Sequence, residues 1–129
     1  PAVPNYECVE ALIEGSKKVG LTYHTGVVQS KDSYYGQHSP ERMPVANDLL
    51  TKWNAYIQAG CIASEMESAT LYIVSAVLGC RAGAIFHVAS NQERIKAGLP
   101  NVKTFDTTNA IKASVEALRY LIQKDKAGK

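Results

Sequence analysis

The chain alternates between segments of helical and strand-like hydrophobic pattern, and this alternation constrains its fold more than any other feature. Apolar residues recur at helical spacing in four segments, residues 5–18, 46–58, 68–78 and 106–123. Three short apolar or β-branched segments lie between them, residues 21–28, 61–64 and 82–89. The last of these, AGAIFHVA, is almost continuously apolar, as is typical of a strand buried on both faces of a parallel sheet. We therefore predict an α/β fold, a three-layer sandwich with a mixed, mostly parallel sheet and helices on both faces.

Capping residues and glycines predict where the helices begin and end. Asn5 is the expected N-cap of the first helix and Gly20 its stop, while Gly60 and Gly79 end the two middle helices. Residues 124–129 are expected to fray as a basic tail. Residues 29–44 and 91–104 are polar and contain proline and glycine, so we predict long loops, which in a compact domain are usually functional.

Composition excludes several classes of protein. The 129 residues suffice for one domain, and 14 Lys and Arg against 12 Asp and Glu give a net charge of only +2. This small, dispersed excess does not favour a nucleic-acid partner. The apolar stretch at residues 71–78 is far shorter than the ~20 residues of a membrane span. Cys8, Cys61 and Cys80 form no paired motif, so we expect a reducing, cytoplasmic compartment.

Three strands are few for a sheet of this kind. Sheets usually have about four to six strands, and each outer strand of a three-stranded sheet would expose an edge. We therefore expect that part of the sheet lies outside this chain.

The candidate functional residues follow the predicted strands. In open α/β sheets, ligands bind beyond the carboxyl ends of the strands. Residues 29–42, 65–67 and 90–94 occupy those positions, and we expect them to converge on one crevice.

Glu65 and Glu67 form the most informative pair among these candidates. They flank Met66 between an apolar strand and a helix. Ionised carboxylates only accept hydrogen bonds, so they could hold the vicinal hydroxyls of a sugar. Alternatively, both could sit there because acidic residues are favoured at a helix N-terminus.

Gln37 and Arg42 lie in the long loop with Tyr34 and Tyr35. A glutamine amide can read a donor–acceptor edge such as that of a pyrimidine, and an arginine can stabilise charge on a carbonyl oxygen. The tyrosines could stack on a base. The alternative is a solvated loop whose tyrosines pack onto the domain.

Other catalytic signatures are missing from the sequence. His24, His38 and His87 show no metal-ligand spacing, so we expect no metal site. The sequence also contains no GxSxG elbow, P-loop or GxGxxG motif, which disfavours acyl-enzyme hydrolysis, P-loop phosphoryl transfer and dinucleotide binding.

Three segments together resemble the nucleoside phosphorylase family. They are SEMESATLYIVSAVLGCRAG at residues 64–83, the loop GVVQSKDSYYGQ at residues 26–37, and the opening PAVPNYECVEALIEGSKKVG. The loop is similar to that of the branch that cleaves uridine. The resemblance extends over nearly the whole chain and implies the family's α/β fold.

The resemblance implies a role for each candidate at the ribose. Glu67 would hold the 2′ and 3′ hydroxyls, Met66 would pack against the sugar, and Glu65 would support the site. No cofactor is implied, because phosphate itself is the co-substrate.

The resemblance also implies a uracil site. Gln37 would bind the uracil edge and Tyr34 would lie near the base. The family places an arginine two residues after that glutamine, where this chain has Ser39, so the nearest candidate is Arg42. Ala89 and Ser90 would line the pocket at the uracil 5-position.

The implied activity is that of a pentosyltransferase: reversible phosphorolysis of uridine to uracil and ribose 1-phosphate, with Arg42 and Glu67 as the catalytic residues. One alternative is a purine nucleoside phosphorylase or nucleosidase, which the resemblance disfavours because Ser90 and Asn91 stand where the purine branch has an aspartate. Another is an inactive structural fragment.

Members of the family are much longer than this chain, and their phosphate-binding residues lie in the N-terminal half. We therefore expect residues 1–129 to form a single partial domain, the C-terminal half of such a fold, without phosphate-binding residues of its own. The expected partners are the N-terminal half, nucleoside and phosphate substrates, and further copies in a homo-oligomer, either a dimer or a trimer of dimers.

Overall fold

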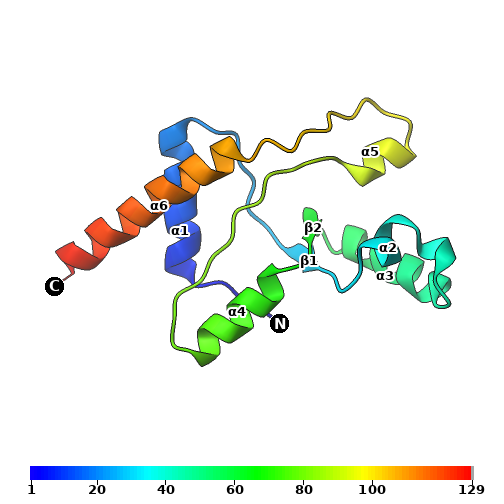
Figure 1. The fold of residues 1–129 in the computed structure, drawn as a ribbon, viewed down its shortest axis with the longest axis horizontal. Helices are drawn as coiled ribbons and strands as arrows, with labels where there is room; N and C mark the ends of the chain where they lie inside the picture. The colour runs from blue at the N-terminus through cyan, green and yellow to red at the C-terminus, as the bar shows by residue number, and fades with distance from the viewer. Residues whose placement is uncertain (129) are drawn as a thin grey trace. The chain divides into compact units, whose positions relative to one another are not determined.

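Helices dominate the computed structural model, which describes residues 1–128 (Figure 1). The helices are α1 (Tyr6–Val19), α2 (Tyr34–His38), η1 (Pro40–Arg42, a 3-10 helix), α3 (Ala46–Gln58), α4 (Ser68–Val77), α5 (Gln92–Lys96) and α6 (Thr108–Ala127). The strands are β1 (Val28–Ser30) and β2 (Ala63–Glu65). The chain divides into two compact units. Unit 1 contains Pro1–Val3 and His24–Leu78, and unit 2 contains Pro4–Tyr23 and the described residues from Gly79 onward.

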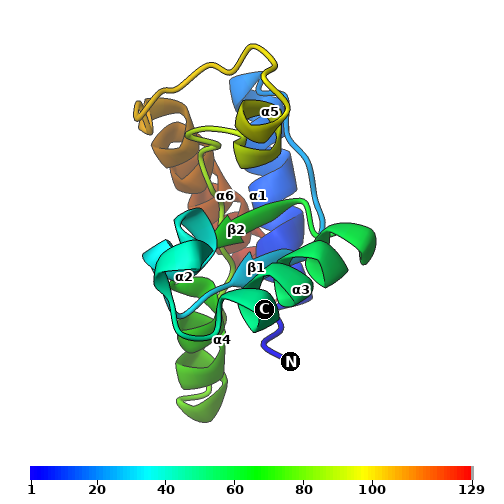
Figure 2. The same cartoon turned by 90° about the vertical axis from the view of Figure 1, so that its right-hand side faces the viewer.

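A parallel pair of strands, β1 and β2, forms the sheet of unit 1 (Figure 2). Val28 pairs with Ala63, Gln29 with Ser64, and Ser30 with Glu65. The Lys31 amide extends the ladder by donating to the Glu65 carbonyl at 2.9 Å. The predicted parallel pairing is therefore confirmed for these strands, and it brings their carboxyl ends to one edge.

The predicted third strand is wrong, and a three-layer sandwich is not confirmed. Residues 82–89 have no strand partner in the described part of the chain. The segment was expected to be buried on both faces, but Phe86 and Val88 are exposed. Extended backbone becomes a strand only where a neighbour completes the hydrogen-bond ladder. The two paired strands are also shorter and later than predicted, at residues 28–30 and 63–65.

The predicted helices are largely confirmed. The observed α3 has the predicted bounds, and α4 ends one residue early. Gly20, Gly60 and Gly79 all adopt positive φ where the helices stop. Asn5 holds the N-cap position of α1, but its side chain accepts from the Ala82 amide at 2.8 Å and does not cap the helix.

Two predictions about irregular segments need correction. The stretch predicted as a loop at residues 29–44 contains α2 and η1, and the stretch at residues 91–104 contains α5. The expected frayed tail is helical as far as Ala127, since Lys124 bonds Glu10 at 2.6 Å and Asp125 bonds Arg81 at 2.6 Å. Lys129 lies outside the described residues.

The helices α1 and α6 pack against each other in unit 2 (Figure 1). Ala11, Gly15, Ala113 and Ala117 are buried where these helices pack. The aliphatic stripe of α6, by contrast, is exposed. It consists of Ile111, Val115, Leu118 and Ile122. The two helices therefore approach each other closely at their small residues, and the larger apolar side chains of α6 stay exposed.

No helix in the described residues combines the length and apolar character needed to cross a membrane.

Candidate functional site

The carboxyl ends of β1 and β2 gather most of the predicted site residues in unit 1. Lys31 follows β1 directly, and Glu65 closes β2. The loop after β1 folds back as α2, which carries Gln37, and the Ser33 hydroxyl caps this helix by accepting from the Gly36 amide at 3.0 Å. The segments that follow the two strands meet where the Lys31 amide donates to the Glu65 carbonyl at 2.9 Å, and Ser64 bonds both Lys31 and Gln37. The convergence of residues 29–42, 65–67 and 90–94 on one crevice stays a prediction.

Glu65 is bound to the first turn of α4. Its Oε2 accepts from the amides of Glu67 and Ser68, each at 2.7 Å, and its Oε1 accepts from the Ser68 hydroxyl at 2.6 Å. Burial raises the pKa of Glu65, but the hydrogen bonds from Ser68, Glu67 and Ser30 outweigh it and hold the pKa below its ordinary value. The carboxylate therefore satisfies amides that a helix start leaves unpaired.

Glu67 lies at the same helix start but is exposed. Its Oε2 accepts from the Met66 amide at 3.2 Å, and its Oε1 has no hydrogen bond to a described residue. Met66 is 39% exposed beside it. Of the two glutamates, Glu67 thus keeps acceptor capacity for a ligand.

Gln37 is held by a relay of hydrogen bonds that the sequence did not suggest. Lys31 Nζ donates to Ser64 Oγ at 3.0 Å, and Ser64 Oγ donates to Gln37 Oε1 at 2.7 Å. Burial lowers the pKa of Lys31, while the charges of Glu65 and Glu67 act in the opposite direction. The sequence contained one signal for this relay, the position of Lys31 and Ser64 at the strand ends where ligands bind.

Aromatic and cationic side chains surround α2. The Tyr34 ring stacks on His38 with centroids 4.1 Å apart, and it meets Tyr35 edge-on at 5.4 Å. The Arg42 guanidinium lies over the Tyr35 ring at 5.5 Å. Tyr34 is 54% exposed, so a face of the loop remains available to a flat ligand.

Ala89 and Ser90 belong to unit 2, so their predicted place beside the uracil 5-position stays a prediction. Asn91, one of the two residues that the resemblance places where the purine branch has an aspartate, caps α5 through its Oδ1, which accepts from the Arg94 amide at 2.9 Å. A neutral amide engaged in this way is not a general acid.

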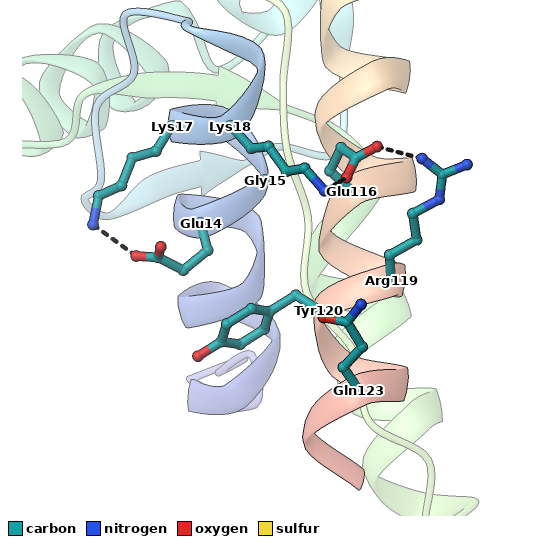
Figure 3. Close-up of a pocket in the computed structure, with 8 residues that line it drawn as sticks. All are labelled: Glu14, Gly15, Lys17, Lys18, Glu116, Arg119, Tyr120 and Gln123. Carbon is teal, nitrogen blue, oxygen red and sulfur yellow. Dashed lines mark hydrogen bonds and ion pairs between the residues drawn. The ribbon is translucent and has the colours of Figure 1, made fainter. Parts of the chain in front are cut away.

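A hollow of about 380 Å³ in unit 2 lies elsewhere, between α1 and α6 (Figure 3). Its charged lining is paired internally. Glu116 holds both Lys18 and Arg119 at 2.5 Å, and Glu14 holds Lys17 at 2.7 Å. None of the predicted site residues lines it. The described residues also contain no group of three or more His, Cys, Asp or Glu side chains that could hold a metal.

Comparison with known proteins identifies similar sequences over nearly the whole chain. A family described as "Phosphorylase superfamily" matches residues 1–123. The uridine phosphorylase of Treponema pallidum is 45% identical over 97% of this chain, and that of Escherichia coli is 38% identical over 95%. A guanosine phosphorylase of Halorubrum lacusprofundi is 31% identical over 70% of the chain.

The matches cover only part of each relative. The chain spans 48% of the Treponema protein, 49% of the Escherichia protein and 33% of the Halorubrum protein. It therefore spans about half the length of the uridine phosphorylases that it matches.

Proposed function

Because the chain belongs to the phosphorylase superfamily, we propose that it serves in a uridine phosphorylase, which splits uridine with phosphate into uracil and ribose 1-phosphate. The observation that carries this proposal is the 45% identity to a protein named uridine phosphorylase over 97% of the chain. The arrangement of Gln37, Ser64 and Glu67 around the strand ends supports it.

Glu67 is the proposed ribose ligand. It is exposed and keeps one carboxylate oxygen outside the hydrogen bonds of the described residues, so it can accept from two vicinal hydroxyls. Its negative charge also favours the positive charge that develops on the ribosyl ring as the glycosidic bond breaks. Met66 packs against the sugar, and Glu65 supports the site by stabilising the start of α4.

Gln37 and Arg42 are the proposed uracil ligands, with Tyr34 close to the base. An arginine that donates to a uracil oxygen stabilises the charge of the departing base, so no residue needs to form a covalent intermediate. The protein then contributes mainly positioning, which can supply several kcal/mol of the barrier. No cofactor takes part, and phosphate acts as the nucleophile.

The phosphate site belongs, in this proposal, to an N-terminal half that completes the fold. The relatives contain about as many residues again beyond the part matched here. A completed protein would add strands to the short β1–β2 pair, cover the exposed stripe of α6 and form the three-layer sandwich. Exposed aliphatic side chains on one helix face favour such a cover, at roughly 25 cal/mol per Å² buried.

Measuring release of uracil tests the proposal. The chain joined to the N-terminal half should cleave uridine only when phosphate is present, and should barely cleave inosine or guanosine. Residues 1–129 alone should be inactive. Equal rates without phosphate would indicate a nucleosidase, faster cleavage of guanosine would indicate a purine enzyme, and inactivity of the joined protein would indicate a structural fragment.

We further propose a homo-oligomer in a reducing, cytoplasmic compartment. Within the described residues no disulfide joins Cys8, Cys61 and Cys80, which supports the compartment. Sedimentation of the joined protein tests the oligomer, and a monomer at micromolar concentration would contradict it.

A further inference from the structure

We propose that Ser64 and Lys31 make the site selective for uracil over cytosine by holding the side-chain amide of Gln37 in one orientation. The inference rests on the proposed function, because it concerns the base that the same site recognises. It assigns a positioning role to two residues that contact the substrate only through Gln37.

The direction of the relay follows from the chemistry of its donors. The Lys31 ammonium can donate but cannot accept, so the Ser64 oxygen must accept from it over their 3.0 Å separation. The Ser64 proton is then free to point away from Lys31. It finds Gln37 Oε1 at 2.7 Å, a normal length for a hydroxyl bonded to a carbonyl oxygen.

This arrangement distinguishes the two ends of the amide. If the amide turned by 180°, its NH₂ group would face the hydroxyl, and the Ser64 proton would lose its acceptor. Both hydrogen bonds are partly buried, where an unpaired polar group is costly. Ser64 also lies within β2, whose backbone pairs with β1, so the hydroxyl starts from a rigid element.

The fixed amide still has a donor and an acceptor for a ligand. One lone pair of Oε1 remains free beside the two N–H groups of the amide nitrogen. Uracil matches this order, because its N3–H donates while the neighbouring carbonyl oxygen accepts. Cytosine presents the reverse order at N3 and its 4-amino group, so it would require the amide to turn.

The test compares uridine with cytidine in the protein joined to its N-terminal half. Ser64→Ala should reduce the ratio of kcat/KM for uridine over cytidine about two- to tenfold, the range set by one neutral hydrogen bond. Ser64→Thr keeps the hydroxyl and should restore the ratio. Ser75→Ala, in the last turn of α4, serves as the matched serine control and should leave the ratio unchanged.

Lys31→Met should lower the ratio in the same direction as Ser64→Ala, since the hydroxyl then loses the donor that directs its proton. A purely structural role would lower the melting temperature and both rates together without changing their ratio. If the wild type cleaves uridine and Ser64→Ala keeps the wild-type ratio, the inference is wrong while the proposed function stands.

If the wild type does not cleave uridine, the proposed function is refuted. A second readout then tests on its own whether Ser64 fixes the orientation of the Gln37 amide. The side-chain amide signals of Gln37 can be followed by ¹⁵N NMR in the 129-residue chain. They should shift in Ser64→Ala and return in Ser64→Thr. Signals unchanged by Ser64→Ala would show that Ser64 does not hold the Gln37 amide, and would refute the inference.

Discussion

At the scale of single residues, the two glutamates that follow β2 have different surroundings although only Met66 separates them. Glu65 turns back onto α4 and accepts from two amides and a hydroxyl. Glu67 remains exposed and accepts only from the Met66 amide among the described residues. One glutamate therefore stabilises the helix start, and the other is available to a ligand.

Glu67→Gln should lower kcat/KM for uridine in the joined protein about ten- to a hundredfold. The substitution keeps the shape but removes a charged acceptor, and hydrogen bonds to charged groups contribute about 1.5–3 kcal/mol. The loss should be smaller for 2′-deoxyuridine, which lacks one of the two hydroxyls. Steady-state rates on both substrates check this, and an equal loss on both would argue against a ribose role.

Glu65→Gln should instead lower the free energy of unfolding, by about 1–2 kcal/mol at pH 7. The pKa of Glu65 is lowered in the folded chain, so its stabilisation is complete above the ordinary glutamate value of about 4.3. It is lost as the pH falls through the lower folded value. Urea unfolding of both proteins between pH 7 and pH 2 should show the difference shrinking below about pH 4. A difference that stays constant would contradict this assignment.

At the scale of elements, the α1–α6 pair depends on the absence of a side chain at Gly15. A Cβ atom there would meet the Ala117 amide nitrogen at 2.8 Å and would also collide with the Ala113 carbonyl. Both neighbours are backbone atoms within a helix, so they cannot rotate away. The close approach therefore requires glycine.

Gly15→Ala should destabilise the chain by about 1–3 kcal/mol through overpacking, although alanine is the better helix former by about 1 kcal/mol. Gly128→Ala is the matched control, since a Cβ there meets only the Lys124 carbonyl oxygen at 3.6 Å. Thermal unfolding followed by circular dichroism compares the two. Stabilisation by Gly15→Ala would show that the helices can move apart at little cost.

At the scale of the whole molecule, small apolar side chains are buried while many larger ones are exposed. The buried hydrophobic residues of the described chain are all small, namely Cys8, Ala11, Ala82, Ala113 and Ala117. On α6 the larger aliphatic side chains are exposed, with Leu118 at 60% and Ile122 at 52%. Under the proposed function, the N-terminal half would cover these exposed side chains.

Leu118→Asp should therefore impair assembly with the N-terminal half and leave the isolated chain nearly unchanged. In the isolated chain the position is exposed, so the free energy of unfolding should change by less than about 0.5 kcal/mol. In the joined protein the aspartate would be buried without a partner, and uridine cleavage should fall at least about tenfold. Asn109→Asp, which adds the same charge at an exposed position of α6, is the control. Normal activity of Leu118→Asp would show that the stripe stays uncovered.

Part of the local structure followed from the amino-acid sequence alone. Helix bounds at residues 46–58 and the glycine stops were predictable, because helical periodicity and positive φ depend on neighbours in the chain. The parallel pairing of the first two strands followed from the alternation of helical and strand-like segments. The resemblance also pointed to Gln37 and Glu67 before any geometry was known. Their roles remain proposals, since sequence patterns name residue types and not their contacts.

Which partners these residues find depends on the tertiary structure. Asn5 bonds Ala82 instead of capping α1, Ser64 holds Gln37, and α6 packs through Ala113 and Ala117 instead of its aliphatic stripe. Each of these contacts joins residues that are distant in the chain. A hydrogen-bonding or apolar side chain has several possible partners of equal chemistry, and the backbone geometry around it selects among them. Residues 82–89 illustrate the same point, because an apolar run becomes a strand only beside another strand.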